Sequence, residues 1–173
     1  PPIARVVALG TALGEFVSDV EGRILVTASG GLSHDPPIPA LAGAPASVRE
    51  RLVAGGELSS EARVARQERL LADAADQVVG RSAQRPLNPE WDRRFLEQLQ
   101  RGDFNAIAAL DDAAITRDAG CGGHEIRSWI AASAAARTAG VASFELKLYR
   151  PIPEWVAGFG VMTGGPAPVT ENF

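Results

Sequence analysis

The sequence predicts an α/β protein, a helix-rich layered fold around a mixed or mainly parallel sheet. Two patterns lead to this fold class. Several long segments carry apolar residues at alternating steps of three and four, which is typical of amphipathic helices, and shorter runs rich in Val, Ile and aromatic residues are typical of strands. The chain of 173 residues is 46% hydrophobic and 22% charged, as expected of one globular domain with a sizeable core.

The N-terminal segment predicts a helix followed directly by a buried strand. Pro2 suits the first turn of the helix, Glu21-Gly22 ends it, and residues 23–28 read Arg-Ile-Leu-Val-Thr-Ala. A helix that leads into a buried strand is the second half of an α/β unit. We therefore expect the first strand of this unit to lie upstream of Pro1, and the domain to be incomplete. The apolar stripe of the helix comprises Ile3, Val6, Gly10, Leu13, Val17 and Val20.

The remaining elements follow from capping residues and periodicity. Asn88-Pro89-Glu90 is a strong helix start, with Asn as N-cap and Pro at the first helical position. Glycines and prolines mark the turns between the other segments. Helices are predicted over 46–54, 60–79, from 89 onward, over 104–110, 112–117 and 124–137, and strands over 142–149 and 155–162.

Composition excludes several classes of protein. The net charge of −4 and pI near 5.2 argue against nucleic-acid binding, which requires a basic surface. The sequence also lacks a basic amphipathic segment of the kind that binds to a membrane surface. The only cysteine, Cys121, cannot form an internal disulfide, so we expect a reducing, cytoplasmic setting.

His34 is the first candidate for chemistry. It follows the predicted strand in a run that reads Ser-Gly-Gly-Leu-Ser-His-Asp-Pro-Pro-Ile-Pro from Ser29 to Pro39. Active sites of open α/β sheets collect at the carboxyl ends of strands. A histidine there can accept and return protons near neutral pH. The alternative is a turn histidine that only bonds to local backbone.

Glu125 is the second candidate, in the run Gly122-Gly123-His124-Glu125. A carboxylate in the first turn of a helix is kept ionised by the unpaired N–H groups and the helix dipole, and an ionised carboxylate is a good metal ligand. The alternative is a glutamate that merely stabilises the helix N-terminus. Adjacent helical residues point about 100° apart, so His124 should not face the same metal as Glu125. We interpret His124 as a supporting or structural residue.

Three stretches taken together resemble the class III extradiol dioxygenases. They are residues 29–39, residues 124–129 (His-Glu-Ile-Arg-Ser-Trp) and residues 149–160 (Tyr-Arg-Pro-Ile-Pro-Glu-Trp-Val-Ala-Gly-Phe-Gly). Residues 85–92, Arg-Pro-Leu-Asn-Pro-Glu-Trp-Asp, also match. The similarity runs in order along nearly the whole chain.

The resemblance implies a non-haem Fe(II) site with two histidines and one glutamate. Glu125 matches the ligand glutamate, and His34 matches an acid–base histidine rather than a ligand. The two iron histidines and a second acid–base histidine belong to N-terminal segments that are not in this chain. We therefore expect residues 1–173 to be the C-terminal part of a single catalytic domain, inactive alone.

The expected reaction is extradiol cleavage of a catechol such as 3-(2,3-dihydroxyphenyl)propionate by O₂, in bacterial catabolism of aromatic compounds. The substrate carboxylate would favour an arginine clamp, for which Arg150 is a candidate, although an arginine beside proline can equally form a structural salt bridge. The alternative function is a non-catalytic subunit or binding protein that keeps the fold without iron. Expected partners are the catechol, O₂, and either a second copy or a complementing N-terminal chain.

Overall fold

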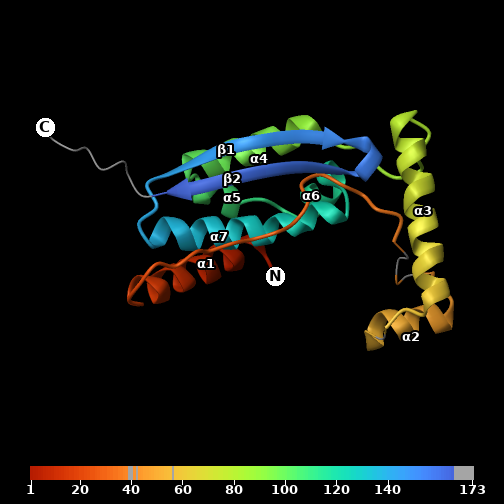
Figure 1. The fold of residues 1–173 in the computed structure, drawn as a ribbon, viewed down its shortest axis with the longest axis horizontal. Coiled ribbons are helices and arrows are strands. Elements are labelled where there is room, and N and C mark those ends of the chain that lie inside the picture. The colour runs from red at the N-terminus through yellow and green to blue at the C-terminus, as the bar shows by residue number, and fades with distance from the viewer. Residues whose placement is uncertain (39–40, 42, 56, 166–173) are drawn as a thin grey trace, which may run out of the picture.

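The structure is a computed structural model that describes residues 1–38, 41, 43–55 and 57–165. Helices form most of it, and a single β-hairpin forms the sheet (Figure 1). The elements are α1 (Ile3–Ser18), α2 (Ala46–Ala54), α3 (Ser60–Val78), α4 (Pro89–Arg101), α5 (Phe104–Ala108), α6 (Asp112–Ala119), the 3₁₀ helix η1 (Gly122–Glu125), α7 (Ile126–Thr138), β1 (Ser143–Ile152), the 3₁₀ helix η2 (Pro153–Trp155) and β2 (Ala157–Gly165).

The core lies between α4, α7 and the inner face of the hairpin. Helix α4 begins as predicted, because the side chain of Asn88 accepts a hydrogen bond from Trp91 N, and Gly102 ends it in a left-handed conformation. Its apolar face packs into the core, which also receives Ile3 and Val6 from α1 and Leu32 from the loop before His34. The fully buried large side chains include Ile3, Leu32, Phe95, Leu96, Leu99, Ile107, Ile115, Ile126 and Ile130.

Helices α1 and α7 pack closely because glycines line the contact. A Cβ on Gly10 would lie 2.5 Å from Ala131 O, and one on Gly14 would lie 2.4 Å from Ala135 O. The buried face of α1 is therefore narrower than the predicted stripe. Leu13 and Val20 are exposed instead.

The helix-rich α/β class is confirmed, but the sheet differs in strand direction. Strands β1 and β2 pair antiparallel, from Ser143↔Gly165 to Ile152↔Ala157, and they are the only strands in the described residues. A mixed or mainly parallel sheet was expected. The short link through η2, with Val156 at φ 55°, allows only a hairpin, because parallel strands need a longer crossover.

The predicted buried strand at 23–28 is wrong for this chain. The segment is extended but pairs with no strand among the residues described, and its central residue, Leu25, is 85% exposed. A strand exists only through hydrogen bonds to a neighbour, and the hairpin does not reach this segment. Its sequence pattern is nevertheless that of a buried strand.

Helices α2 and α3 lie at one end of the molecule, where α3 contacts η2 at the turn of the hairpin (Figure 1). Their bounds match the prediction, and Ser59 caps α3 through a bond from Ala62 N. Within α3 only Ala74 is buried, whereas Val64 and Leu71 are exposed. Among the described residues, no helix is long and apolar enough to cross a membrane.

Candidate active site

The loop that carries His34 is joined to β2 by main-chain bonds. Leu32 N donates to Gly158 O at 3.1 Å, and Gly158 N donates to Ser33 O at 2.9 Å. On the other side, His34 N donates to Ala119 O at 2.8 Å, and Gly122 N donates to His34 O at 3.0 Å. The backbone on both sides of the histidine is therefore fixed by segments that are distant in sequence.

A buried carboxylate, Asp92, holds the same loop from α4. It accepts bonds from Ser33 N at 2.7 Å, from Ser33 Oγ at 2.9 Å and from the Tyr149 hydroxyl at 2.8 Å. Asn88 N donates in turn to Ser33 Oγ at 2.9 Å. A carboxylate with no exposed surface is tolerated only with such partners.

Burial and hydrogen bonding oppose each other in this network. Burial raises the pKa of Asp92, although the bonds from Tyr149 and Ser33 act in the opposite direction. The pKa of Tyr149 is also raised, first by burial and then by its bond to Asp92. A Cβ on Gly158 would lie 2.3 Å from Asp92 Oδ2, so there is no room for a side chain beside the carboxylate.

His34 directs one ring nitrogen at its own loop and the other at Glu125. Its Nδ1 lies 2.8 Å from Leu32 O, a carbonyl that can only accept, so Nδ1 carries the proton and Nε2 presents its lone pair in the neutral ring. The Nε2 atom lies 3.4 Å from Glu125 Oε1. The histidine side chain is only 11% exposed, and a Cβ on Gly122 would lie 2.2 Å from its Nε2.

Glu125 ends η1 directly before α7 and presents its carboxylate to solvent. Its Oε2 accepts from Gly31 N at 2.7 Å, while the side chain remains 56% exposed. The glycine loop lies close because Gly30 has no side chain: a Cβ there would be 2.7 Å from Glu125 O. The structure thus brings together the two residues that the sequence singled out, 91 positions apart.

His124 forms a separate set of contacts, with α6 and α7. Its Nδ1 accepts from Arg127 Nη1 at 2.6 Å, and its Nε2 lies 2.7 Å from Thr116 Oγ1, so both ring nitrogens are occupied. Burial and the positive charge of Arg127 lower the pKa of His124. Arg127 also forms an ion pair with Asp112 at 2.6 Å. This geometry matches a structural role, because the neutral ring links α6 to α7.

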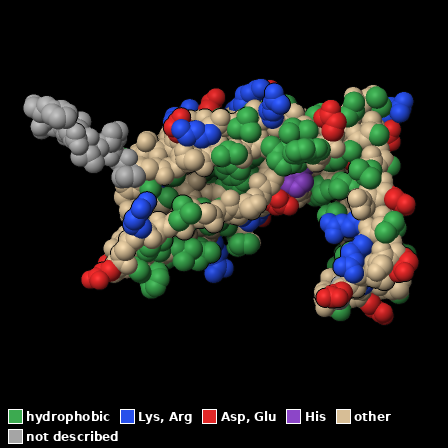
Figure 2. Space-filling view, in the orientation of Figure 1, with side chains coloured by type: hydrophobic (Ala, Val, Ile, Leu, Met, Phe, Trp, Pro, Cys, Tyr) green, Lys and Arg blue, Asp and Glu red, His purple; other side chains and the backbone are tan. Residues whose placement is uncertain are grey.

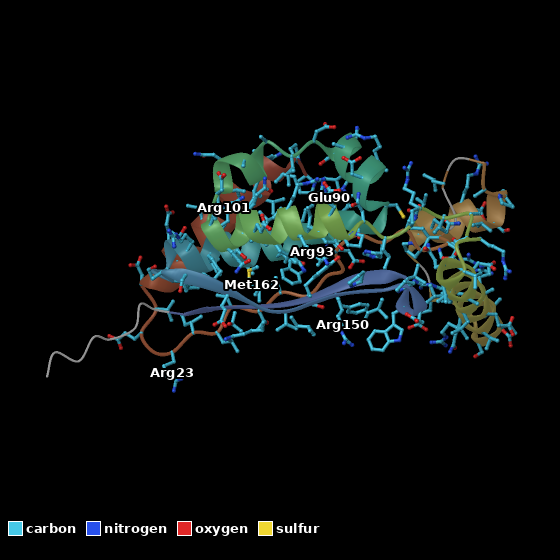
Figure 3. All side chains as sticks on the ribbon, turned by 90° about the horizontal axis from the view of Figure 1, so that it is seen from above. Arg23, Glu90, Arg93, Arg101, Arg150 and Met162 are labelled. Atoms are coloured by element: carbon cyan, nitrogen blue, oxygen red, sulfur yellow. The ribbon has the colours of Figure 1, made fainter. Side chains whose placement is uncertain are left out.

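Arg150 lies on β1, on the side turned away from α4 (Figure 3). Neighbouring strand residues face opposite ways, and Tyr149 points toward α4, where Arg93 stacks on its ring with 5.3 Å between the guanidinium and the ring centre. Arg150 is exposed, and no ion pair joins it to an acid among the residues described. The structure therefore does not bring it into contact with His34 or Glu125.

The residue after the histidine, Asp35, fastens the far end of the loop. It accepts from Cys121 N at 2.9 Å and from Arg85 N at 3.2 Å. Burial would raise the pKa of Asp35, but the bonds from Cys121 and Arg85 outweigh it and lower the pKa. Burial and the neighbouring Asp35 raise the pKa of the Cys121 thiol to about 11, so this cysteine is not an activated nucleophile.

The donor set around His34 and Glu125 is incomplete for a metal. In the part of the chain that the structure describes, no three His, Cys, Asp or Glu side chains lie close enough to hold an ion together. A carboxylate and at most one imidazole are fewer ligands than a facial triad requires. These residues alone do not fit an iron site, and a complete site would need further ligands from elsewhere.

Sequence reasoning missed the network behind the histidine. Asp92 lies in the first helical turn, where an acid is ordinarily explained by the helix dipole. Ser33 and Tyr149 gave no signal of their own. One available clue was that Ser33, Asp92 and Tyr149 each fall inside a different matched stretch, which suggested that the stretches meet.

Comparison with known proteins supports one family. Residues 1–160 match the model of the catalytic LigB subunit of aromatic ring-opening dioxygenase. Proteins named 2,3-dihydroxyphenylpropionate/2,3-dihydroxicinnamic acid 1,2-dioxygenase are 49% identical over 172 residues in Cupriavidus pinatubonensis, 50% over 169 in Paraburkholderia xenovorans and 42% over 165 in Mycolicibacterium paratuberculosis.

These matches cover 98%, 96% and 95% of this chain but only 55%, 54% and 53% of the relatives. The chain therefore spans about half the length of the curated relatives that it matches, corresponding to their C-terminal portion. The resemblance that the three stretches indicated is confirmed. This chain belongs to the LigB family of aromatic ring-opening dioxygenases.

Proposed function

We propose that this chain is the C-terminal part of an Fe(II)-dependent extradiol dioxygenase that uses O₂ to cleave a catechol such as 3-(2,3-dihydroxyphenyl)propionate. The observation that supports this most directly is that His34 Nε2 lies 3.4 Å from Glu125 Oε1, on a loop fixed by Asp92. The names of the relatives support the substrate class.

His34 is proposed as the general base. With the Nδ1 proton directed to Leu32 O, the Nε2 lone pair is available for a proton from a catechol hydroxyl. The low exposure of the ring limits competition from water, and Gly122 leaves the space that the ring fills. The same atom could return the proton later in the reaction.

Glu125 is proposed as one ligand of the iron. Its carboxylate is exposed, and Gly31 N fixes one oxygen while the other remains available. Iron in a site of two histidines and one carboxylate keeps positions open for substrate and oxygen. We propose that both histidine ligands belong to the part of the longer protein that this chain does not match, and that residues 1–173 form one catalytic domain with it.

Arg150 is proposed as the partner of the substrate carboxylate. Its exposure, with no acid paired to it in the described chain, supports an arginine that is available for a ligand. Because it does not contact the His34–Glu125 pair, the clamp would act on the far end of the substrate. The free Cys121 thiol supports a reducing, cytoplasmic location.

The test uses this chain joined to the missing N-terminal portion, loaded with Fe(II) without oxygen and then assayed for ring-cleavage product. His34→Ala should keep its iron and lose about 10²- to 10⁴-fold in turnover. Glu125→Ala should lose the iron itself, measured by metal content after desalting. His124→Ala is the matched control and should keep the iron.

Release of iron by His34→Ala would refute the division of roles. A joined protein that folds but binds no iron would instead favour the second candidate function, a non-catalytic subunit or binding protein. The incomplete donor set in the described residues is the observation that keeps this candidate open. The 173-residue chain alone should bind Fe(II) weakly and cleave no catechol.

A further inference from the structure

A wedge-shaped cleft separates the extended segment 22–28 from β2. Its volume is about 770 Å³, and α7 forms its floor. Figure 2 shows hydrophobic side chains gathered on this face, between the hairpin and the segment below it. The lining includes Ile24, Leu25, Val26, Trp129, Val161 and Met162.

Both walls of the wedge are free backbone edges. No main-chain N–H or C=O of residues 24–28 bonds to another described residue. The outer edge of β2 bonds to the loop at Gly158, and beyond Gly158 β2 pairs along one edge alone among the described residues, with β1. Unpaired edges of this kind are templates for another strand. The walls converge where Leu32 and Ser33 bond to Gly158, directly before His34.

The chemistry of the lining favours polypeptide over substrate. None of the side chains that line the wedge is charged, so nothing there would pair with the carboxylate of an acidic catechol. Exposed Ile24, Leu25 and Val26 form an apolar run that a monomeric domain would ordinarily cover. Main-chain edges on two sides and apolar residues beneath match the needs of a β-strand.

We infer that the wedge receives a β-strand from the part of the longer protein that this chain does not contain. The relatives are nearly twice as long as the matched region, and the portion that this chain does not match would supply the strand. A strand seated between 24–28 and β2 would join the segment and the hairpin into one sheet. It would end at the closed end of the wedge, and its adjoining loop would lie beside His34 and Glu125.

This placement explains why the donor set is incomplete. The loop at the end of the inserted strand reaches the open side of Glu125, where the proposed function, on which this last step rests, requires further ligands. The strand itself is inferred from the free edges and the lining alone, so the two ideas can be separated by experiment.

The test is hydrogen–deuterium exchange on this chain alone and on the chain joined to the N-terminal portion of the Cupriavidus pinatubonensis relative. Amides of 24–28 should exchange at least tenfold more slowly in the joined protein, while those of α4 remain unchanged. Leu25→Asp should remove this protection. Val53→Asp, on the similarly exposed α2, is the matched control and should leave it intact.

Equal exchange in the two proteins would overturn the inference. Slower exchange of 24–28 in the isolated chain at higher protein concentration would also overturn it, because a second copy would then be the occupant. Slower exchange on addition of 3-(2,3-dihydroxyphenyl)propionate would overturn it as well, because a substrate would then be the occupant. An inactive joined protein with protected 24–28 amides keeps the inference and counts against the proposed function. Mixing the two portions as separate chains provides the same comparison if the fusion does not fold.

Discussion

Two consecutive stretches of this chain, residues 23–28 and residues 29–35, are held in opposite ways. In the second, backbone or side-chain groups bond to α4, α7, β2 and the turn after α6, and Leu32 and Ser33 are buried. In the first, no backbone group of 24–28 has a partner among the described residues, and Leu25 is largely exposed. The boundary between them lies a few residues before the catalytic candidate.

The difference separates a stretch whose contacts lie within this chain from a stretch whose backbone has no partner among the described residues. The position of His34 depends on contacts within residues 1–173, so this part of the proposed site is already in place. The pairing of the preceding segment depends on a neighbour that the described chain does not supply. The predictions below test each side of this contrast.

The largest effect is expected from Asp92→Ala. This change leaves Ser33 N, Ser33 Oγ and the Tyr149 hydroxyl without their acceptor, and breaking a buried network of this kind costs about 3 kcal/mol in the free energy of unfolding. Urea denaturation measures the loss. Asp19→Ala, at an exposed helix end, should change it by less than about 0.5 kcal/mol. Equal effects would mean that the loop is not anchored by Asp92.

Gly122→Ala should come next, at about 1–3 kcal/mol. The new methyl group would lie 2.2 Å from Nε2 of His34, so the ring must leave its place against the Leu32 carbonyl. The chain has only two histidines, so the ring signals can be followed by NMR alongside denaturation. Gly165→Ala, which meets no atom within 4 Å, is the control. An unmoved His34 signal would contradict the packing described.

A smaller, pH-dependent effect is expected from Asp35→Asn. The folded protein lowers the pKa of Asp35, so the ionised form adds stability that is fully present above the usual value of 3.8 and is lost as pH falls through the folded pKa. Asp35→Asn should therefore cost about 1 kcal/mol at pH 6 and less at pH 3. Denaturation at both pH values measures this, and a cost that grows toward acid would refute it.

Local sequence signals predicted the helices well because their determinants are local. The Asn88 cap with Pro89 fixed the start of α4, and the bounds of α2 and α3 came from periodicity. The same signals failed at 23–28, because a run of apolar residues with high strand propensity favours burial but does not ensure that a partner strand is present. They also predicted a wider buried stripe on the N-terminal helix than the structure contains, because Leu13 and Val20 are exposed.

The sequence singled out His34 and Glu125, which the structure brings close together, but not the residues that hold them. His34 and Glu125 came from glycine-flanked positions and from the family resemblance, and the structure places their side chains 3.4 Å apart. The roles of Asp92 and Tyr149 depend on the meeting of α4 with β1, a tertiary contact that residue type alone does not encode. A lone acid in a helical turn looks the same whether it is buried or solvated.

The smallest effect in this chain is expected from Leu25→Ala, which tests the difference between residues 23–28 and residues 29–35 most directly. A side chain that is 85% exposed loses little on truncation, so the free energy of unfolding of the isolated chain should change by less than about 0.5 kcal/mol. In the joined protein, a strand in the wedge would bury this leucine, and the same change should cost about 2 kcal/mol or more. Paired denaturation curves give both values. A large cost in the isolated chain would mean that residues 23–28 are already held, and the boundary between the two stretches would disappear.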